Sequence, residues 1–153
     1  MGAFVSVHGR RLGFDSKTGH LQAKGGGIDL SRPCVDATIT VSDEAATVAN
    51  QRDITITLKD ATGAAINYAE MVELIVFSSS AMTDFTATGG STGIAAGASG
   101  KILALVAKKV FRAISTTAGA IAVIYTDTGS DAAYLGVRLP NGRIVAGGLL
   151  TNA

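Results

Sequence analysis

The segment Gly89–Gly93 has the spacing Gly-x-Ser-x-Gly, which in many hydrolases presents a serine nucleophile for acyl transfer. That chemistry needs a strand before the serine, a helix after it, and a histidine later in the chain. Both histidines, His8 and His20, precede the segment, and residues 94–100 are mainly glycine, alanine and serine. We therefore interpret residues 89–93 as part of a loop and not as a catalytic elbow.

A second candidate for chemistry is Asp127-Thr128-Gly129, which follows an apolar run and resembles the Asp-Thr-Gly motif of aspartic proteases. A chain of 153 residues would have to dimerise, so that two carboxylates could share one proton. The same three residues also suit a β-turn, because Asp can accept a hydrogen bond from the backbone and Gly tolerates positive φ. We favour the turn and keep a dimeric aspartic protease as a distant alternative.

The composition gives no support for a metal site or a cofactor site. Cys34 is the only cysteine, so we expect a buried thiol with no internal disulfide and no cysteine-based zinc site. The net charge of +1 provides no field that would steer the chain to nucleic acid or anionic lipid. We expect no signal peptide and no membrane span, since no apolar run reaches about 18 residues. The sequence predicts a protein that is not an enzyme, with no catalytic residues, cofactor, metal or small-molecule substrate.

The elements that would position any functional residue are predicted to be strands. The chain has 19 glycines, and only 16% of its residues are charged, so good helix-forming surface residues are scarce. In residues 53–59, Ile54, Ile56 and Leu58 face one side and two threonines face the other, which is the period of a half-buried strand. Similar runs, separated by turns, occupy residues 36–41, 70–78, 119–126, 133–139 and 143–150. This pattern predicts an all-β fold, an antiparallel β-sandwich of the immunoglobulin-like or jelly-roll type, over residues 34–153.

Three segments of this body are harder to assign. Residues 86–101 contain little to bury and are predicted to form a long surface loop with room for one short edge strand. Residues 101–114 place apolar side chains at both helical and strand spacing, and we favour two strands joined at Lys108-Lys109 over a helix. Residues 42–46 resemble the capped start of a helix.

Residues 1–33 are predicted to form a separate N-terminal arm. Residues 11–14 and 20–23 flank Asp15–Gly19, which suits the turn of a hairpin. Three consecutive glycines at 25–27, and Pro33 after them, mark a junction. We place the boundary of the body near residue 33 and expect the arm to anchor the protein to a partner.

Six stretches between Asp36 and the C-terminus share an order and spacing that suggest a known domain: Ala45–Val48, Ile54–Gly63, Val72–Ser78, Thr126–Gly129, Tyr134–Arg143 and Leu150–Ala153. With these stretches, the run resembles a β-sandwich domain found in virion proteins of tailed bacteriophages. The turn at 106–109, where that domain usually has a glycine, reads Val-Ala-Lys-Lys here, and the C-terminal residues lack the expected aromatic. The resemblance implies an immunoglobulin-like or jelly-roll sandwich on the particle surface, acting as a capsid decoration (cement) protein or a head fibre.

From this resemblance we expect a structural protein on the outer capsid surface of the virion, made in the cytoplasm of the bacterial host. Its expected partners are the major capsid protein and further copies of itself in a homotrimer, with no nucleic acid and no membrane. A tail, collar or fibre-base component of the same fold is the alternative. The residues predicted to contact partners are Phe4, Arg10, Arg11, Phe14 and Lys17 in the arm, and Ile75 and Phe77, which make the second face of their strand apolar.

Overall fold

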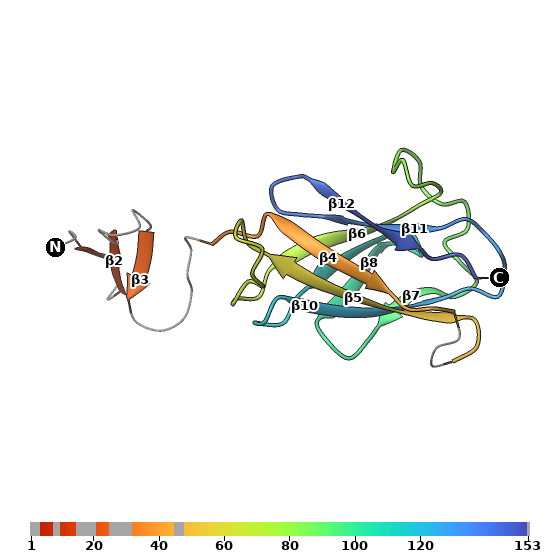
Figure 1. The fold of residues 1–153 in the computed structure, drawn as a ribbon, viewed down its shortest axis with the longest axis horizontal. Coiled ribbons are helices and arrows are strands. Elements are labelled where there is room, and N and C mark those ends of the chain that lie inside the picture. Colours follow the sequence, from red (N-terminus) through yellow and green to blue (C-terminus); the bar gives the residue numbers. More distant parts are fainter. Residues whose placement is uncertain (1–3, 8–9, 15–20, 25–31, 45–47, 153) are drawn as a thin grey trace.

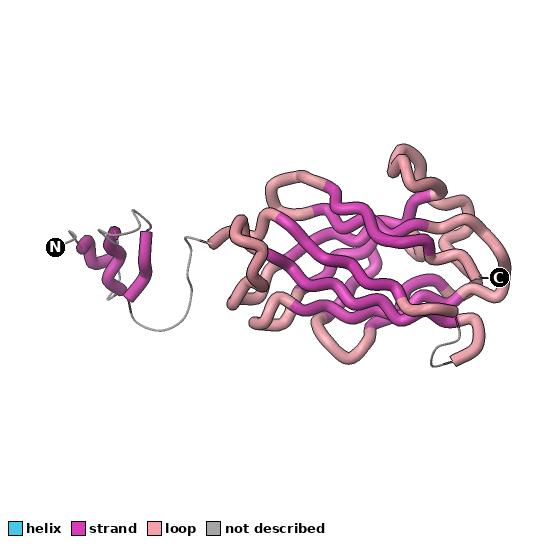
Figure 2. Tube along the Cα trace, viewed as in Figure 1, coloured by secondary structure: helices cyan, strands magenta, loops and turns pink. Residues whose placement is uncertain are grey.

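The computed structural model describes residues 4–7, 10–14, 21–24, 32–44 and 48–152, and the side chains of residues 32–44 and 48–152. Every regular element in this part of the chain is a strand, as Figure 2 shows. The prediction of an all-β, antiparallel sandwich is therefore confirmed. Residues 15–20, which hold the predicted arm turn and Lys17, lie outside the described residues.

The arm contains a three-stranded antiparallel sheet in the order β1-β2-β3, drawn apart from the body in Figure 1. Its strands are β1 (Phe4–Val7), β2 (Arg10–Phe14) and β3 (Leu21–Lys24). Phe14 pairs with Leu21 across β2 and β3, so the hairpin predicted around residues 15–19 has the expected partners.

The body consists of two antiparallel sheets packed face to face (Figure 1). The first has the order β4-β5-β10-β7, from β4 (Asp36–Val41), β5 (Gln51–Lys59), β10 (Ala120–Thr126) and β7 (Gly93–Ala96). The second has the order β12-β11-β6-β9-β8, from β12 (Ile144–Leu149), β11 (Tyr134–Arg138), β6 (Met71–Phe77), β9 (Val110–Ile114) and β8 (Lys101–Val106).

The strand order is that of an immunoglobulin sandwich with one insertion. Without β8 and β9, the seven remaining strands read A-B-E-D in one sheet and C-F-G in the other, which is the constant-type arrangement. The β8–β9 hairpin follows β7 in the chain and extends the second sheet beyond β6, the strand in the C position. This insertion leaves β8 as an edge strand of a five-stranded sheet that faces only four strands.

The core lies between the two sheets and follows the period-two pattern. Ile54, Ile56 and Leu58 of β5 point inward and are buried, as predicted, and they belong to one cluster with the inward residues of β6. Burying one such side chain contributes about 1.5–3 kcal/mol. Cys34 is a buried free thiol of this cluster, and burial raises its pKa above the ordinary value, as does the nearby charge of Glu70.

The turn between β11 and β12 forms as its sequence predicts. Gly142 N–H donates to the Leu139 carbonyl (2.9 Å), and Leu139 N–H donates to the Arg143 carbonyl (2.8 Å). Pro140 presets φ at the first corner, while Gly142 has φ of +85°. This five-residue connection, residues 139–143, joins β11 to the edge strand β12.

Three segments of the body had no clear assignment from the sequence pattern, and the structure describes most of their residues. Residues 101–114 form two strands, and Lys108 takes the left-handed position of their turn with φ of +62°. The loop 86–101 contains the short edge strand β7. The Ser42 hydroxyl, predicted to cap a helix, accepts a hydrogen bond from Asp53 N–H (2.9 Å) across the hairpin; residues 45–47 of the predicted helix start lie outside the described residues.

The chain is fixed to the body where it leaves the arm. The Tyr68 hydroxyl donates to the Arg32 carbonyl (3.2 Å) and accepts from Cys34 N–H (2.9 Å). The Arg32 guanidinium lies 3.4 Å from a carboxylate oxygen of Asp60, whose side chain is 1% exposed. These contacts hold residues 32–34 on the turn after β5.

Asp60→Asn is expected to make the stability of the body less dependent on pH below about pH 4. A hydrogen bond from the Thr62 hydroxyl (2.6 Å), followed by backbone N–H groups and Arg32, holds the pKa of Asp60 below its ordinary value despite burial. The carboxylate thus adds stability that is fully present above the unfolded pKa of about 3.9 and is lost as the pH falls through the folded pKa.

Urea unfolding near pH 7 and near pH 3 measures this effect. The free energy of unfolding of the unchanged protein should exceed that of Asp60→Asn near pH 7. The difference between the two free energies should become smaller near pH 3. The same change at exposed Asp43 controls for the loss of one carboxylate. A gap that stayed constant with pH would contradict the prediction.

Candidate protein-interaction surface

The outer face of the five-stranded sheet is the side turned away from the core. Since side chains alternate along a strand, burial of Val72 and Leu74 in β6 turns Met71, Glu73 and Ile75 outward. The strand register sets their neighbours: Met71 pairs with Ile114, which in turn pairs with Lys101 of β8. We use the term outer face for this side of strands β12, β11, β6, β9 and β8.

Large apolar side chains are exposed on this sheet, most of all along β8. Leu103 is 65% exposed, and five of the six β8 residues are exposed. Even inward-facing Ala104 is exposed, because the opposite sheet is one strand narrower. The large apolar residues of the five strands that are exposed by 40% or more are Met71, Leu103, Leu105, Val106, Ile114, Ile144 and Leu149. Three of these residues, Leu103, Leu105 and Val106, lie on the single strand β8, and a cluster of exposed apolar side chains marks a protein-binding site or an aggregation risk.

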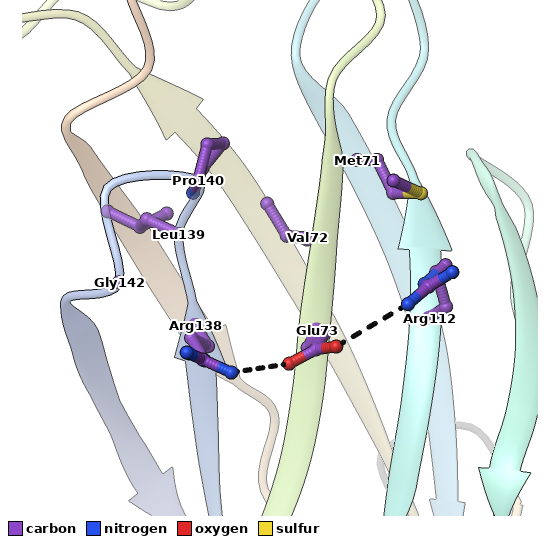
Figure 3. A pocket seen from close by; sticks show the side chains of 8 residues that line it. All are labelled: Met71, Val72, Glu73, Arg112, Arg138, Leu139, Pro140 and Gly142. Atoms are coloured by element: carbon purple, nitrogen blue, oxygen red, sulfur yellow. Dashed lines mark hydrogen bonds and ion pairs between the residues drawn. The ribbon is translucent and has the colours of Figure 1, made fainter.

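A row of charges crosses the outer face. Glu73 lies between two arginines on neighbouring strands, with Arg138 Nη1 at 3.2 Å and Arg112 Nη2 at 3.7 Å (Figure 3). Such exposed pairs add at most about 1 kcal/mol each to stability. Their greater consequence is a positive excess, because two guanidinium groups face one carboxylate.

A pocket of about 190 Å³ is lined by all three charged residues of this row. It is smaller than the roughly 300–1,000 Å³ of a typical ligand pocket. Its walls combine apolar side chains with the three charged groups, which suits one side chain of a protein partner better than a cofactor. The lining residues, all drawn in Figure 3, are Met71, Val72, Glu73, Arg112, Arg138, Leu139, Pro140 and Gly142.

One end of the outer face is covered by the protein itself. The ring of Phe85, from the loop after β6, stacks on Phe77 with ring centroids 6.4 Å apart and planes 5° apart. Phe77 also packs over Gly136, where a Cβ atom would lie 2.7 Å from the Phe77 ring. Phe77 is consequently only 6% exposed, and its partner from the loop, Phe85, is 56% exposed.

Two of the predicted contact residues, Ile75 and Phe77, have described side chains, and both lie on the outer side of β6. Ile75 is half-buried on the outer face, and Phe77 is covered by its own chain. Phe4 lies in β1, while Arg10, Arg11 and Phe14 lie in β2; their side chains are outside the described part of the structure. These arm residues, with Lys17, stay predictions.

The contact residues predicted from the sequence do not include the apolar residues of β8. The run Lys101–Val106 contains four large apolar side chains and begins with a lysine, a residue common on edge strands. These features indicate an exposed apolar edge strand only if residues 101–114 form strands and β8 ends its sheet, and the sequence alone establishes neither point.

The Asp127 carboxylate has the arrangement of a turn. Its Oδ1 accepts hydrogen bonds from Gly129 N–H (3.1 Å) and Ser91 N–H (2.9 Å), so it joins the turn after β10 to the loop before β7. Asp127 is 2% exposed, and its Oδ2 is buried without a hydrogen bond. Burial raises the pKa of the neighbouring Tyr125 to about 12, with a smaller contribution from the Asp127 charge. The hydrogen bond from Gly129 N–H is the one that the turn interpretation of Asp127-Thr128-Gly129 predicts.

The segment that follows β12 is fixed by Asn152. Its side-chain amide donates to the carbonyls of Asn50 (2.9 Å) and Asp127 (2.7 Å) and accepts from Arg52 Nε (3.1 Å). Arg52 also donates to the Thr151 carbonyl (2.7 Å). Asn152 is 2% exposed, so these bonds form away from solvent.

Within residues 32–44 and 48–152, no three His, Cys, Asp or Glu side chains gather closely enough to hold a metal ion. The described chain also contains no helix with the length and hydrophobicity of a membrane span. Comparisons with protein-family models, curated proteins and solved structures gave no match to this chain.

Proposed function

We propose that this protein is a non-catalytic structural subunit of a tailed-phage particle that binds the major capsid shell as a decoration or head-fibre protein. The proposal combines the sequence resemblance of residues 36–153 with a body whose outer face suits protein contacts. Its expected place is the outer capsid surface, and it requires no cofactor.

The exposed apolar surface around β8 is the observation that carries the proposal. Interface cores are typically depleted in charge and bury large apolar side chains, and here Leu103, Leu105 and Val106 stand exposed on one strand. A protein with such a surface gains stability when a partner covers it, because apolar burial contributes about 25 cal/mol per Å².

The arm and the body have different roles in this proposal. The arm, residues 1–33, adds contacts without enlarging the core. The contacts of Arg32 with Asp60 and of Cys34 with Tyr68 fix the point where the arm leaves the body. A homotrimer would close part of the outer face between copies. Two linked contacts bind more tightly than either one alone, because the second forms at a high effective concentration.

Addition of the purified protein to bare capsids tests the proposal. We expect it to co-sediment with the capsids and to saturate at a stoichiometry proportional to the number of major capsid protein copies. Saturation at a few copies per particle would favour the tail, collar or fibre-base alternative. No association with any part of the particle would overturn the proposal.

A further inference from the structure

We propose that the free edge of β8 takes up an extended segment of a partner protein as a sixth strand, and that this segment is apolar along its length and acidic at its ends. This inference deepens the proposed function, on which it rests, by naming the chemistry of the partner segment. It assigns to β8 the recognition mode known as strand addition.

The backbone of β8 is available for pairing. β8 pairs only with β9 and ends the sheet, so its other edge has no partner strand in the described parts of the chain. An edge strand presents a row of unpaired N–H and C=O groups, which is a template for another strand. At six residues, β8 is long enough to present several of these groups.

The side chains of β8 favour an apolar partner segment. Leu103 points to the outer face beside Arg112, and Leu105 and Val106 are exposed beyond it. An added strand would place its own side chains next to these residues, and cross-strand pairs of apolar residues stabilise a sheet.

The chain segment that contains β8 carries only basic charged residues, and its lysines determine the ends of the partner segment. Residues 85–126 contain four basic residues and no acidic residue. Lys108 is engaged by the carbonyls of Gly90 (3.2 Å) and Ser91 (2.6 Å). Lys101 at one end of β8 and Lys109 just past the other would therefore meet the two ends of an added strand, where acidic side chains are complementary.

The same charges disfavour a second copy of this chain at the edge. In an antiparallel pair of β8 strands, Lys101 of each copy would lie toward the Lys108–Lys109 turn of the other. Like charges at both ends of the pair would repel, and lysine on an edge strand is a known device against such pairing. A segment with acidic ends has attraction at the same two places.

A synthetic peptide provides the test, with fluorescence anisotropy as the readout. The probe is a labelled peptide of alternating valine and threonine with two aspartates at each end; its control carries lysines in place of the aspartates. We expect the full-length protein to bind the aspartate peptide at least about tenfold more tightly than the lysine peptide. Amide hydrogen exchange should slow in β8 when the aspartate peptide binds.

Two variants separate the edge from the rest of the surface. Leu103→Lys puts a charge in the middle of the edge and should weaken binding of the aspartate peptide about tenfold or more. Val48→Lys, at a residue that is 50% exposed outside the sheets, is the matched control and should bind normally. Lys101→Glu combined with Lys109→Glu should reverse the preference toward the lysine peptide.

The proposal fails if the protein binds neither peptide, binds both equally, or binds the aspartate peptide equally well after Leu103→Lys. It also fails if the protein forms a dimer that Leu103→Lys abolishes, since the edge would then belong to a second copy. If Leu103→Lys coats bare capsids as well as the unchanged protein, the inference falls and the proposed function stands. If the protein binds the aspartate peptide selectively but never associates with phage particles, the inference about β8 stands and the proposed function falls.

Discussion

Removal of residues 1–31 is expected to leave a folded body that no longer coats bare capsids. The buried cluster lies within residues 34–150, and the truncated chain keeps Arg32 and Cys34 on their partners Asp60 and Tyr68. Loss of one of two linked contacts can lower the apparent affinity by about 10²–10⁴-fold. Co-sedimentation with capsids measures the loss, and thermal unfolding followed by circular dichroism checks that the body is intact.

A full-length variant with Arg10→Ala and Arg11→Ala refines this experiment. If the basic residues of β2 contact an acidic capsid surface, coating should weaken and its salt dependence should decrease. Arg143→Ala, at an exposed arginine of the β11–β12 turn, is the matched control. Undiminished coating by the truncated protein would contradict the role of the arm as an anchor.

Asn152→Ala is expected to destabilise the body by about 3 kcal/mol, since each buried group left unpaired costs roughly 1–3 kcal/mol. The substitution leaves the carbonyls of Asn50 and Asp127 and the Nε of Arg52 without this partner. Urea unfolding measures the change, and Asn67→Ala, at an exposed residue, is the control. Equal effects of the two substitutions would show that the bonds of Asn152 contribute little.

The fold class was predictable because the period-two pattern is explicit in the strongest strands. In β5, Ile54, Ile56 and Leu58 alternate with threonines, and only a half-buried strand places all three in one core. The turn at Pro140 and Gly142 was equally clear, since each residue suits one backbone position.

The segment 101–114 could not be settled by periodicity, because its apolar residues fit both a helix and two strands. The outcome depends on tertiary structure: β6 has a free edge beyond the C position, and β9 pairs with it from Met71↔Ile114 onward. Lys108 fills a left-handed turn position without glycine, and its ammonium group is held by the loop carbonyls of Gly90 and Ser91.

The candidate surface was mostly beyond the reach of the sequence for a related reason. Sequence indicates which residues are apolar, but it does not indicate which strand ends a sheet, and that position is what exposes Leu103. Likewise, Phe77 ends an apolar run in the sequence, which does not show that its cover comes from Phe85 in a loop of its own chain. The arm residues stay predictions, since their side chains lie outside the described part of the structure.

The measurement that tests the central claim most directly is the copy number of this protein in purified, finished virus, obtained by quantitative mass spectrometry. A decoration or head-fibre protein should be present in a fixed ratio to the major capsid protein. Purified protein added afterwards should bind only to capsids that do not already carry it. A chain abundant in infected cells and missing from mature particles would contradict the account.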